Sequence, residues 1–182
     1  EIKNFNFGII HEIVTPLHNS SPLYITKNIG ETISIFADFW ALNKFDYIIA
    51  LGDRYEMFAA VTATTPFVCK VAHLHAGETT LGAIDNVYRH AISLMSDLLF
   101  VSTDIYKEKA MQINADAQTF NVGALSVENL KKINYLNLEE FKSRFNIDLS
   151  LPTILCTFHP ETVNLEKNII YIHNLLSSFS EL

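Results

Sequence analysis

The sequence predicts an α/β fold built on a mostly parallel sheet, because apolar, β-rich runs alternate along the chain with segments of helical periodicity. The predicted strands span residues 7–10, 47–51, 67–74, 98–101, 119–122 and 153–158. Predicted helices lie between most of them, at residues 22–40, 53–64, 85–95, 104–113 and 138–145. Of the 182 residues 49% are hydrophobic, which is enough to bury a core.

Local signals mark where several helices begin. Ser21 and Pro22 suit the N-cap and the first position of a helix, and apolar residues then recur every three or four positions at Ile25, Ile29, Ile33, Phe36 and Trp40. Asp53 and Glu56 have the spacing of a capping box for the next helix. The run Ser102-Thr103-Asp104 is typical of another helix start.

A break near residues 148–152 predicts the domain organisation. Residues 1–150 would form one domain, and residues 151–182 would begin with a new strand and helix. About thirty residues are too few for a domain, which usually has about 50 or more. The last segment is therefore either the final unit of the same sheet or the start of a truncated second domain.

Composition and charge exclude several classes of protein. The net charge is −7 and basic residues do not cluster, so we expect no nucleic-acid partner. No apolar run approaches the roughly 20 residues of a membrane span. Cys69 and Cys156 lie in apolar runs without CxxC spacing, which predicts buried thiols and a cytoplasmic protein. The glycines form neither a nicotinamide-binding fingerprint nor a P-loop.

Titratable residues follow three of the predicted strands directly. They are Asp53 with Arg54, then His75 with Glu78, and finally His159. Ligands of a parallel sheet bind beyond the carboxyl ends of its strands, so these side chains are candidates for acid, base and binding roles. His159 precedes Pro160 and Glu161, where a helix start would offer backbone N–H groups to a phosphate.

Two further pairs of residues have both a purely structural and a functional interpretation. Asp85 and Arg89 are four apart at a helix start, so they can pair on its surface or contribute to the same pocket. His73 and His75 alternate along a strand and share a face, as in a zinc site. Without a clear third ligand we expect no metal, and a metal-dependent hydrolase is the weaker alternative.

Several ordered motifs together carry a family resemblance. They are Leu51-Gly52-Asp53-Arg54-Tyr55-Glu56-Met57, Ala72-His73-Leu74-His75-Ala76-Gly77-Glu78-Thr79-Thr80, Gly82-Ala83-Ile84-Asp85, Arg89-His90-Ala91-Ile92, Phe120-Asn121-Val122-Gly123-Ala124-Leu125 and Thr157-Phe158-His159-Pro160. In these the chain resembles the hydrolysing UDP-N-acetylglucosamine 2-epimerases of bacterial sialic, legionaminic and related acid synthesis. The resemblance implies a Rossmann-like, glycosyltransferase-B-type N-terminal domain plus the start of the second domain, and hence a fragment.

The resemblance also implies an activity and roles for the residues. UDP is eliminated from a UDP-sugar to give a glycal, and water is added to release the free 2-epimer without a cofactor. The implied catalytic residues are Asp53, Glu78, Asp85 and His159, and the implied binding residues are Arg54, His75, Arg89 and Gly123. Either His75 or Glu78 takes one acid–base role, since His75 stands where relatives have Glu.

The same resemblance implies a homodimer for the complete protein. It leaves the substrate open between UDP-N-acetylglucosamine and a UDP-2,4-diacetamido-trideoxy sugar. A non-catalytic module that binds a nucleotide sugar is the alternative function.

Overall fold

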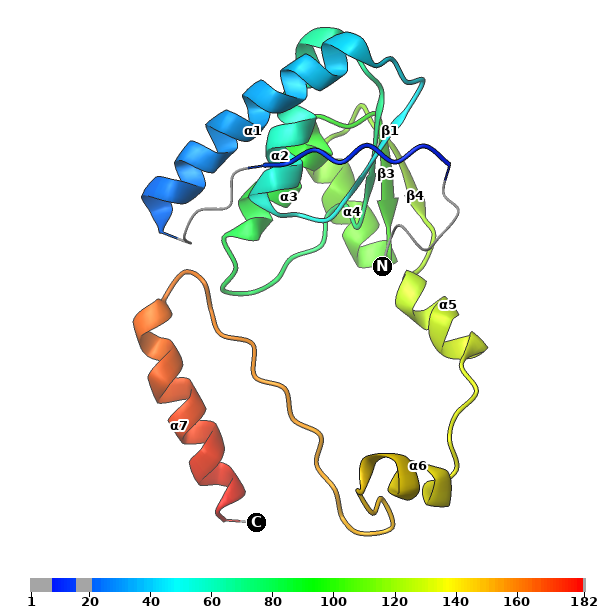
Figure 1. Cartoon of the computed structure of the whole chain (residues 1–182), viewed down its shortest axis with the longest axis vertical. Helices are drawn as coiled ribbons and strands as arrows, with labels where there is room; N and C mark the ends of the chain where they lie inside the picture. Colours follow the sequence, from blue (N-terminus) through cyan, green and yellow to red (C-terminus); the bar gives the residue numbers. More distant parts are fainter. Residues whose placement is uncertain (1–7, 16–20, 182) are drawn as a thin grey trace. The chain divides into compact units, whose positions relative to one another are not determined.

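The computed structural model describes residues 8–15 and 21–181 (Figure 1). The chain divides into two compact units, which we call the first unit (Glu1–Thr79 with Asp85–Val122) and the second unit (Thr80–Ile84 with Gly123–Leu182). The division of the complete protein into domains at residue 150 stays a prediction.

A four-stranded parallel sheet forms the centre of the first unit, as predicted. Its strands are β1 (Ile48–Leu51), β2 (Val71–Leu74), β3 (Leu98–Val101) and β4 (Gln118–Asn121), and they lie side by side in that order. Parallel neighbours that follow the order of the sequence need crossovers of one hand, which puts the connecting helices on one face of the sheet.

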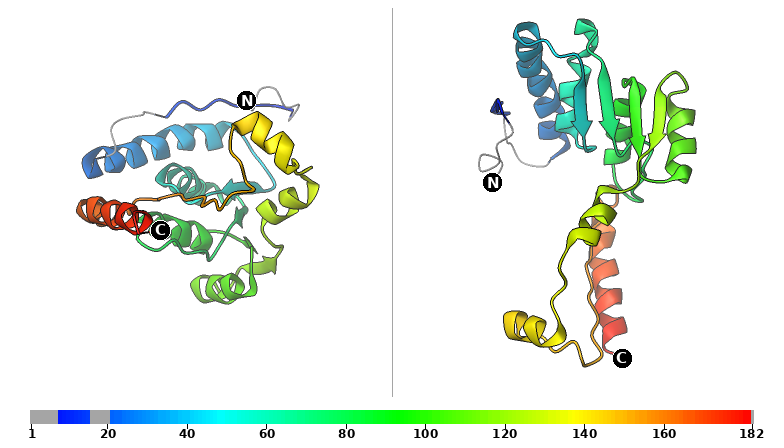
Figure 2. Two further views of the ribbon diagram at one scale, coloured as in Figure 1. Left: turned by 90° about the horizontal axis from the view of Figure 1, so that it is seen from below. Right: turned by 90° about the vertical axis from the view of Figure 1, so that its right-hand side faces the viewer.

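Four helices form that layer, α1 (Pro22–Leu42), α2 (Tyr55–Thr62), α3 (Asp85–Leu94) and α4 (Asp104–Ile113). Each contacts the next in the row, so the layer runs α1-α2-α3-α4 beside the sheet (Figure 2). All four were predicted. The predicted strand over 67–74 was too long at its start, because a 3₁₀ turn (Thr65–Phe67) and a left-handed Val68 precede β2.

The predicted apolar stripe of α1 is buried at Trp40 and half-buried at its other positions. Two polar residues of α1, Asn28 and Thr32, are buried as well. The buried Ala59 and Ala60 of α2 let the two helices approach closely, so these polar side chains fit between them. Trp40 also donates its indole N–H to the carbonyl oxygen of Ala60 at 3.1 Å.

The core lies between the sheet and these helices. One cluster consists of Ala50, Val61, Val71 and Ile92, and another of Ala76, Leu99, Val101 and Ala110. Side chains alternate along β1, where Ala50 is buried while Ile49 and Leu51 are exposed. In the part of the chain that the structure describes, apolar side chains of β1 thus remain exposed on one face of the sheet.

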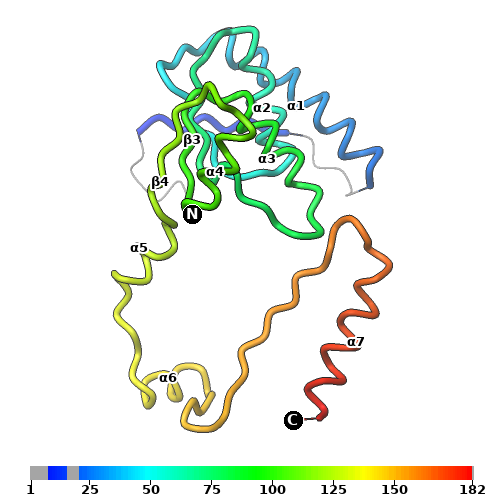
Figure 3. The backbone as a smooth tube through the Cα atoms, turned by 180° about the vertical axis from the view of Figure 1, so that it is seen from behind, coloured from blue at the N-terminus to red at the C-terminus, as the bar shows by residue number. Residues whose placement is uncertain are grey.

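The second unit contains α5 (Leu125–Lys132), α6 (Leu138–Phe145), a 3₁₀ turn (Leu165–Lys167) and α7 (Asn168–Phe179). Asn137 and Glu140 form a capping box that starts α6. Helix α6 and a helix after residue 151 were predicted, whereas α5 was not. Residues 133–137 separate α5 from α6, and a longer segment without helix or strand, residues 146–164, precedes the 3₁₀ turn before α7 (Figure 3).

Two predicted strands are wrong. Residues 153–158 are extended but form no strand, and Gly8–Ile10 also form none, while Phe7 lies outside the described residues. A β-rich run becomes a strand only when another strand accepts its hydrogen bonds, and residues 153–158 are mostly exposed. Cys156 is likewise exposed and Cys69 is half-buried, so the prediction of buried thiols is wrong.

None of the helices within residues 8–15 and 21–181 is long and apolar enough to cross a membrane.

Gly77 is a position where the fold requires glycine. Its φ is +72°, and an added Cβ would lie 2.5 Å from the carbonyl oxygen of Tyr106 and 3.0 Å from the backbone nitrogen of Ala110. We expect Gly77→Ala to lower the free energy of unfolding by about 2 kcal/mol or more, measured by urea denaturation.

Gly30→Ala is the matched control, because Gly30 lies inside α1 with open space around it. This substitution should raise the free energy of unfolding by about 0.5–1 kcal/mol, because alanine favours the helix. Equal effects of the two substitutions would contradict the close packing of Gly77 on α4.

Candidate active site

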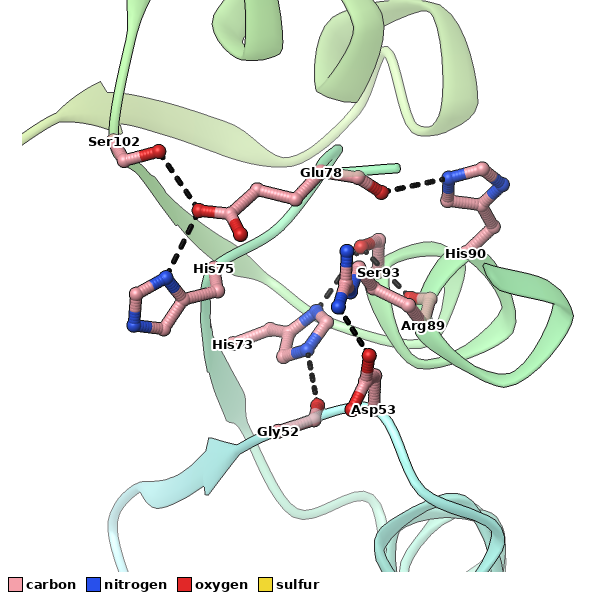
Figure 4. A network of polar contacts seen from close by, with 9 residues as sticks. All are labelled: Gly52, Asp53, His73, His75, Glu78, Arg89, His90, Ser93 and Ser102. Atoms are coloured by element: carbon pink, nitrogen blue, oxygen red, sulfur yellow. Dashed lines mark hydrogen bonds and ion pairs between the residues drawn. The ribbon is translucent and has the colours of Figure 1, made fainter. Parts of the chain in front are cut away.

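A cluster of polar side chains lies at the carboxyl ends of the strands in the first unit (Figure 4). Asp53 follows β1 by two residues, the segment 75–78 follows β2, and Ser102 follows β3 directly. Helix α3 faces these loops with Arg89, His90 and Ser93. The parallel topology therefore brings together residues that are far apart in the sequence.

An ion pair between Arg89 and Asp53 joins α3 to the loop after β1. The Arg89 side chain is only 10% exposed and that of Asp53 is 25% exposed, so both charges are largely removed from solvent. The predicted capping box at Asp53 is wrong, because α2 begins at Tyr55 with Arg54 at the N-cap and no side-chain cap. Of the two interpretations of Asp85 and Arg89, a surface ion pair or a shared pocket, the ion pair is not formed, because Arg89 pairs with Asp53.

Asp85 is the first residue of α3 and lies near Asp53. Partial burial and the neighbouring negative charge of Asp53 raise the pKa of Asp85 above its ordinary value. Its carboxyl group thus holds a proton more readily than a free aspartate does.

His73 is fully buried in β2, and both of its ring nitrogens have protein partners. Nε2 lies 3.1 Å from the carbonyl oxygen of Gly52, and Nδ1 lies 3.0 Å from Oγ of Ser93. Burial lowers the pKa of His73 to about 4, so the ring is neutral at pH 7. A carbonyl only accepts, so Nε2 carries the proton and Nδ1 accepts from the Ser93 hydroxyl.

This arrangement argues against the zinc alternative. With both nitrogens of His73 hydrogen-bonded inside the protein, the ring has no lone pair to give to a metal ion. Over the described ranges of the chain, no three His, Cys, Asp or Glu side chains form a group that could hold a metal.

The carboxylate of Glu78 is held by two donors. Nδ1 of His75 lies 2.9 Å from its Oε1, and Oγ of Ser102 lies 2.7 Å from the same oxygen. Burial acts to raise the pKa of Glu78, but the hydrogen bonds from His75 and Ser102 outweigh it and leave the pKa below its ordinary value. Glu78 is therefore ionised at pH 7, and His75 and Glu78 form one unit.

Three side chains of this cluster, those of Ser93, Ser102 and His90, were not predicted to belong to it. Ser102 was assigned to helix capping, yet only its neighbour Thr103 caps α4, by accepting from the backbone N–H of Tyr106. His90 donates from Nε2 to the carbonyl oxygen of Glu78 at 3.3 Å. The adjacent Arg89 and His90 could have indicated the role of His90. Arg89 contacts the loop after β1, and His90 contacts the loop after β2.

The remaining predicted site residues are Arg54, Gly123 and His159. Arg54 is exposed and pairs with Glu56 at 3.0 Å. Gly123 and His159 belong to the second unit. His159 is exposed in extended backbone, and the next α-helix begins only at Asn168, so the predicted helix start at Pro160 is wrong.

Comparison with known proteins assigns the chain to a family. The sequence profile described as UDP-N-acetylglucosamine 2-epimerase matches residues 2–182. The chain belongs to the UDP-N-acetylglucosamine 2-epimerase family. Its site residues therefore lie on a fold that this family shares.

Curated relatives in the epimerase family are similar over nearly the whole chain. A protein of Campylobacter jejuni named GDP/UDP-N,N'-diacetylbacillosamine 2-epimerase (hydrolyzing) is 34% identical over 97% of this chain and 46% of its own length. The Escherichia coli polysialic acid biosynthesis protein P7 is 32% identical over 98% of this chain and 46% of its own. The chain thus spans about half the length of these relatives.

Solved structures of UDP-N-acetylglucosamine 2-epimerases have the same fold. The enzyme of Neisseria meningitidis, in a crystal structure with UDP-GlcNAc, aligns with a TM-score of 0.53 at 22% identity over 67% of this chain and 36% of its own. The enzyme of Methanocaldococcus jannaschii aligns with a TM-score of 0.53 at 20% identity over 71% of this chain and 36% of its own. This likeness confirms the Rossmann-like fold class predicted from the sequence.

The neutral state of His73 makes stability depend on pH. The unfolded chain binds this proton near pH 6.5 and the folded chain only near pH 4, so the free energy of unfolding should fall as the pH drops through that range. The expected loss from His73 is up to about 3 kcal/mol, measured by urea denaturation at several pH values.

His73→Gln is the variant that isolates this effect, because an amide can still donate to Gly52 but does not titrate. We expect a flatter dependence between pH 4 and 6.5 in this variant. If the wild type and the variant lose stability in parallel, His73 is not the group responsible.

Proposed function

We propose that the complete protein carrying this sequence is a hydrolysing UDP-sugar 2-epimerase, which converts a UDP-2-acetamido sugar and water into UDP and the free 2-epimeric sugar. One observation carries this proposal, namely the geometry at the carboxyl ends of the strands, where Arg89 pairs with Asp53, two donors hold Glu78, and Asp85 begins the facing helix. Glu78 is held ionised while the pKa of Asp85 is raised. Such a pair suits a reaction that both removes and delivers a proton.

The first step in this proposal is elimination. The Glu78 carboxylate takes the proton from C2 of the sugar, and the electron pair of that C–H bond forms the C1–C2 double bond. The bond from C1 to the phosphate oxygen breaks, and UDP leaves with its electrons. The ionised state of Glu78, and its hydrogen bonds from His75 and Ser102, support it as the base rather than His75.

The second step is the addition of water to the glycal. Asp85 gives its proton to C2 on the face opposite to the one that was deprotonated, while the oxygen of water bonds to C1. Asp53, which is paired with Arg89, accepts the proton that the water releases. Exchange with solvent then restores the protonation states of the three carboxyl groups. No electron transfer occurs, so the proposal needs no cofactor.

Binding of the diphosphate requires positive or donor groups, and the family resemblance implies binding roles for Arg54 and Gly123 and a catalytic role for His159 near the leaving group. Arg54 is exposed beside the Asp53 loop, and this exposure supports contact with a charged ligand. The Neisseria relative was crystallised with UDP-GlcNAc, which supports a UDP-sugar as the ligand here. The homodimer and the cytoplasmic location stay predictions.

Two UDP-sugars are candidates for the substrate. The Campylobacter relative acts on the nucleotide-linked N,N'-diacetylbacillosamine that its name gives, and the structural relatives are named for UDP-N-acetylglucosamine. Both carry a 2-acetamido group and UDP at C1, so the same elimination applies to either.

Turnover in D₂O tests the reaction directly. We expect the full-length protein to release UDP from one of the two substrates and to yield a free 2-epimer with deuterium at C2, as followed by NMR. The deuterium enters because Asp85, whose carboxyl proton exchanges with solvent, delivers a deuteron to C2. Binding of UDP without release from either sugar would instead support the non-catalytic alternative.

Substitution of Asp85 tests its role as the acid. Asp85→Asn should lower kcat for sugar release at least about 100-fold, because an amide cannot deliver a proton. Asp38→Asn is the matched control, since Asp38 is an exposed aspartate on α1, and its kcat should equal that of the wild type. Full activity of Asp85→Asn would remove Asp85 from the mechanism.

A further inference from the structure

Ser102 contacts the proposed base from a different strand. It follows β3 directly and donates from Oγ to Oε1 of Glu78 at 2.7 Å, although the two residues are 24 apart in the sequence. Glu78 itself lies in the loop after β2. This hydrogen bond therefore joins the ends of two neighbouring strands through a side chain that is proposed to react.

Both donors to Glu78 converge on the same oxygen. His75 and Ser102 each donate to Oε1, and within the described ranges of the chain Oε2 receives no hydrogen bond (Figure 4). Two hydrogen bonds to one oxygen restrict rotation of the carboxylate, so its second oxygen points in a defined direction. Oε2 is thus the oxygen that remains available to take a proton.

The Ser102 hydroxyl is not needed for the neighbouring helix. Thr103 accepts the hydrogen bond from the backbone N–H of Tyr106 that caps α4, at 3.3 Å. Ser102 is half-buried, and its one hydroxyl proton is directed at the carboxylate. The adjacent hydroxyls of Ser102 and Thr103 therefore have separate tasks, one toward the site and one toward the fold.

We propose that Ser102 is a positioning residue of the epimerase reaction, which holds Glu78 by Oε1 and leaves Oε2 to accept the C2 proton. This inference rests on the proposed function. The hydrogen bond from Ser102 is stronger to the ionised form, since a carboxylate oxygen is a better acceptor than the carbonyl oxygen that Oε1 becomes once Oε2 carries a proton. Loss of the hydroxyl should then affect both the orientation and the protonation of Glu78.

The test is the pH profile of kcat and kcat/KM for the full-length protein and its variants. In Ser102→Ala we expect the midpoint of the acidic limb to move up by about 1 pH unit, because a hydrogen bond to a charged group is lost. At pH 7, kcat should fall about 10-fold with KM changed less than about 3-fold. Ser102→Thr keeps a hydroxyl on the same carbon and should restore the wild-type profile.

Thr103→Ala is the matched control, because it removes the adjacent hydroxyl and the cap of α4 without touching Glu78. We expect a lower melting temperature and an unchanged acidic limb. If Ser102→Ala does not fold, Ser102→Cys has nearly the same volume and a much weaker donor, and its acidic limb should shift in the same direction.

The outcomes separate the two proposals. A wild-type enzyme that turns over, with the same acidic limb and kcat in Ser102→Ala and Ser102→Cys, would overturn the role of Ser102 alone. A wild-type protein that releases no UDP from either substrate would overturn the proposed function and this inference with it. An equal shift in Thr103→Ala would show that the effect comes from α4 and not from the contact with Glu78.

Discussion

The ion pair between Arg89 and Asp53 is the interaction on which the rest of the site depends. A guanidinium that is only 10% exposed requires a partner, because an unpaired buried charge is strongly unfavourable. Asp53 satisfies it across the gap between the loop after β1 and α3. Asp85 begins the same helix, so the ion pair also fixes where the Asp85 carboxyl group lies relative to Asp53. Together with burial, the nearby Asp53 charge raises the pKa of Asp85.

A second contact ties the same loop and helix together through a neutral side chain. The buried ring of His73 bridges the carbonyl oxygen of Gly52 and the hydroxyl of Ser93. Ser93 Oγ also lies 3.0 Å from the carbonyl oxygen of Arg89, and it has only one proton to share. Nδ1 of a neutral His73 has no proton, so it can only accept the hydrogen bond from the Ser93 hydroxyl. Burial, which keeps the ring neutral, thus sets the direction of the hydrogen bonds that His73 makes with Ser93 and Gly52.

The sequence predicted those features that depend on local or periodic signals. The parallel sheet and the helices of the first unit follow from alternating apolar runs and helical spacing. Asp53 and Glu78 were named because they follow strands, and Asp85 because it begins a helix four residues before Arg89. It did not predict which partner each side chain takes. Asp53 pairs with Arg89 rather than capping α2, because the buried guanidinium needs a charge more than the helix needs a cap. Ser102 was missed because its partner is 24 residues away.

The pKa shifts of Glu78 and Asp85 are opposite because their surroundings differ. Hydrogen bonds from His75 and Ser102 stabilise the negative charge of Glu78 against the effect of burial. Burial penalises the negative charge of Asp85, and the neighbouring carboxylate of Asp53 penalises it further. Asp53, His75 and Ser102 follow three different strands, and Asp85 begins a helix. The difference in pKa between the two carboxyl groups therefore depends on the folded sheet, which brings these residues to one edge. The proton-transfer roles of Glu78 and Asp85 therefore depend on how the fold arranges their neighbours. The same short motif on another fold would not have these roles.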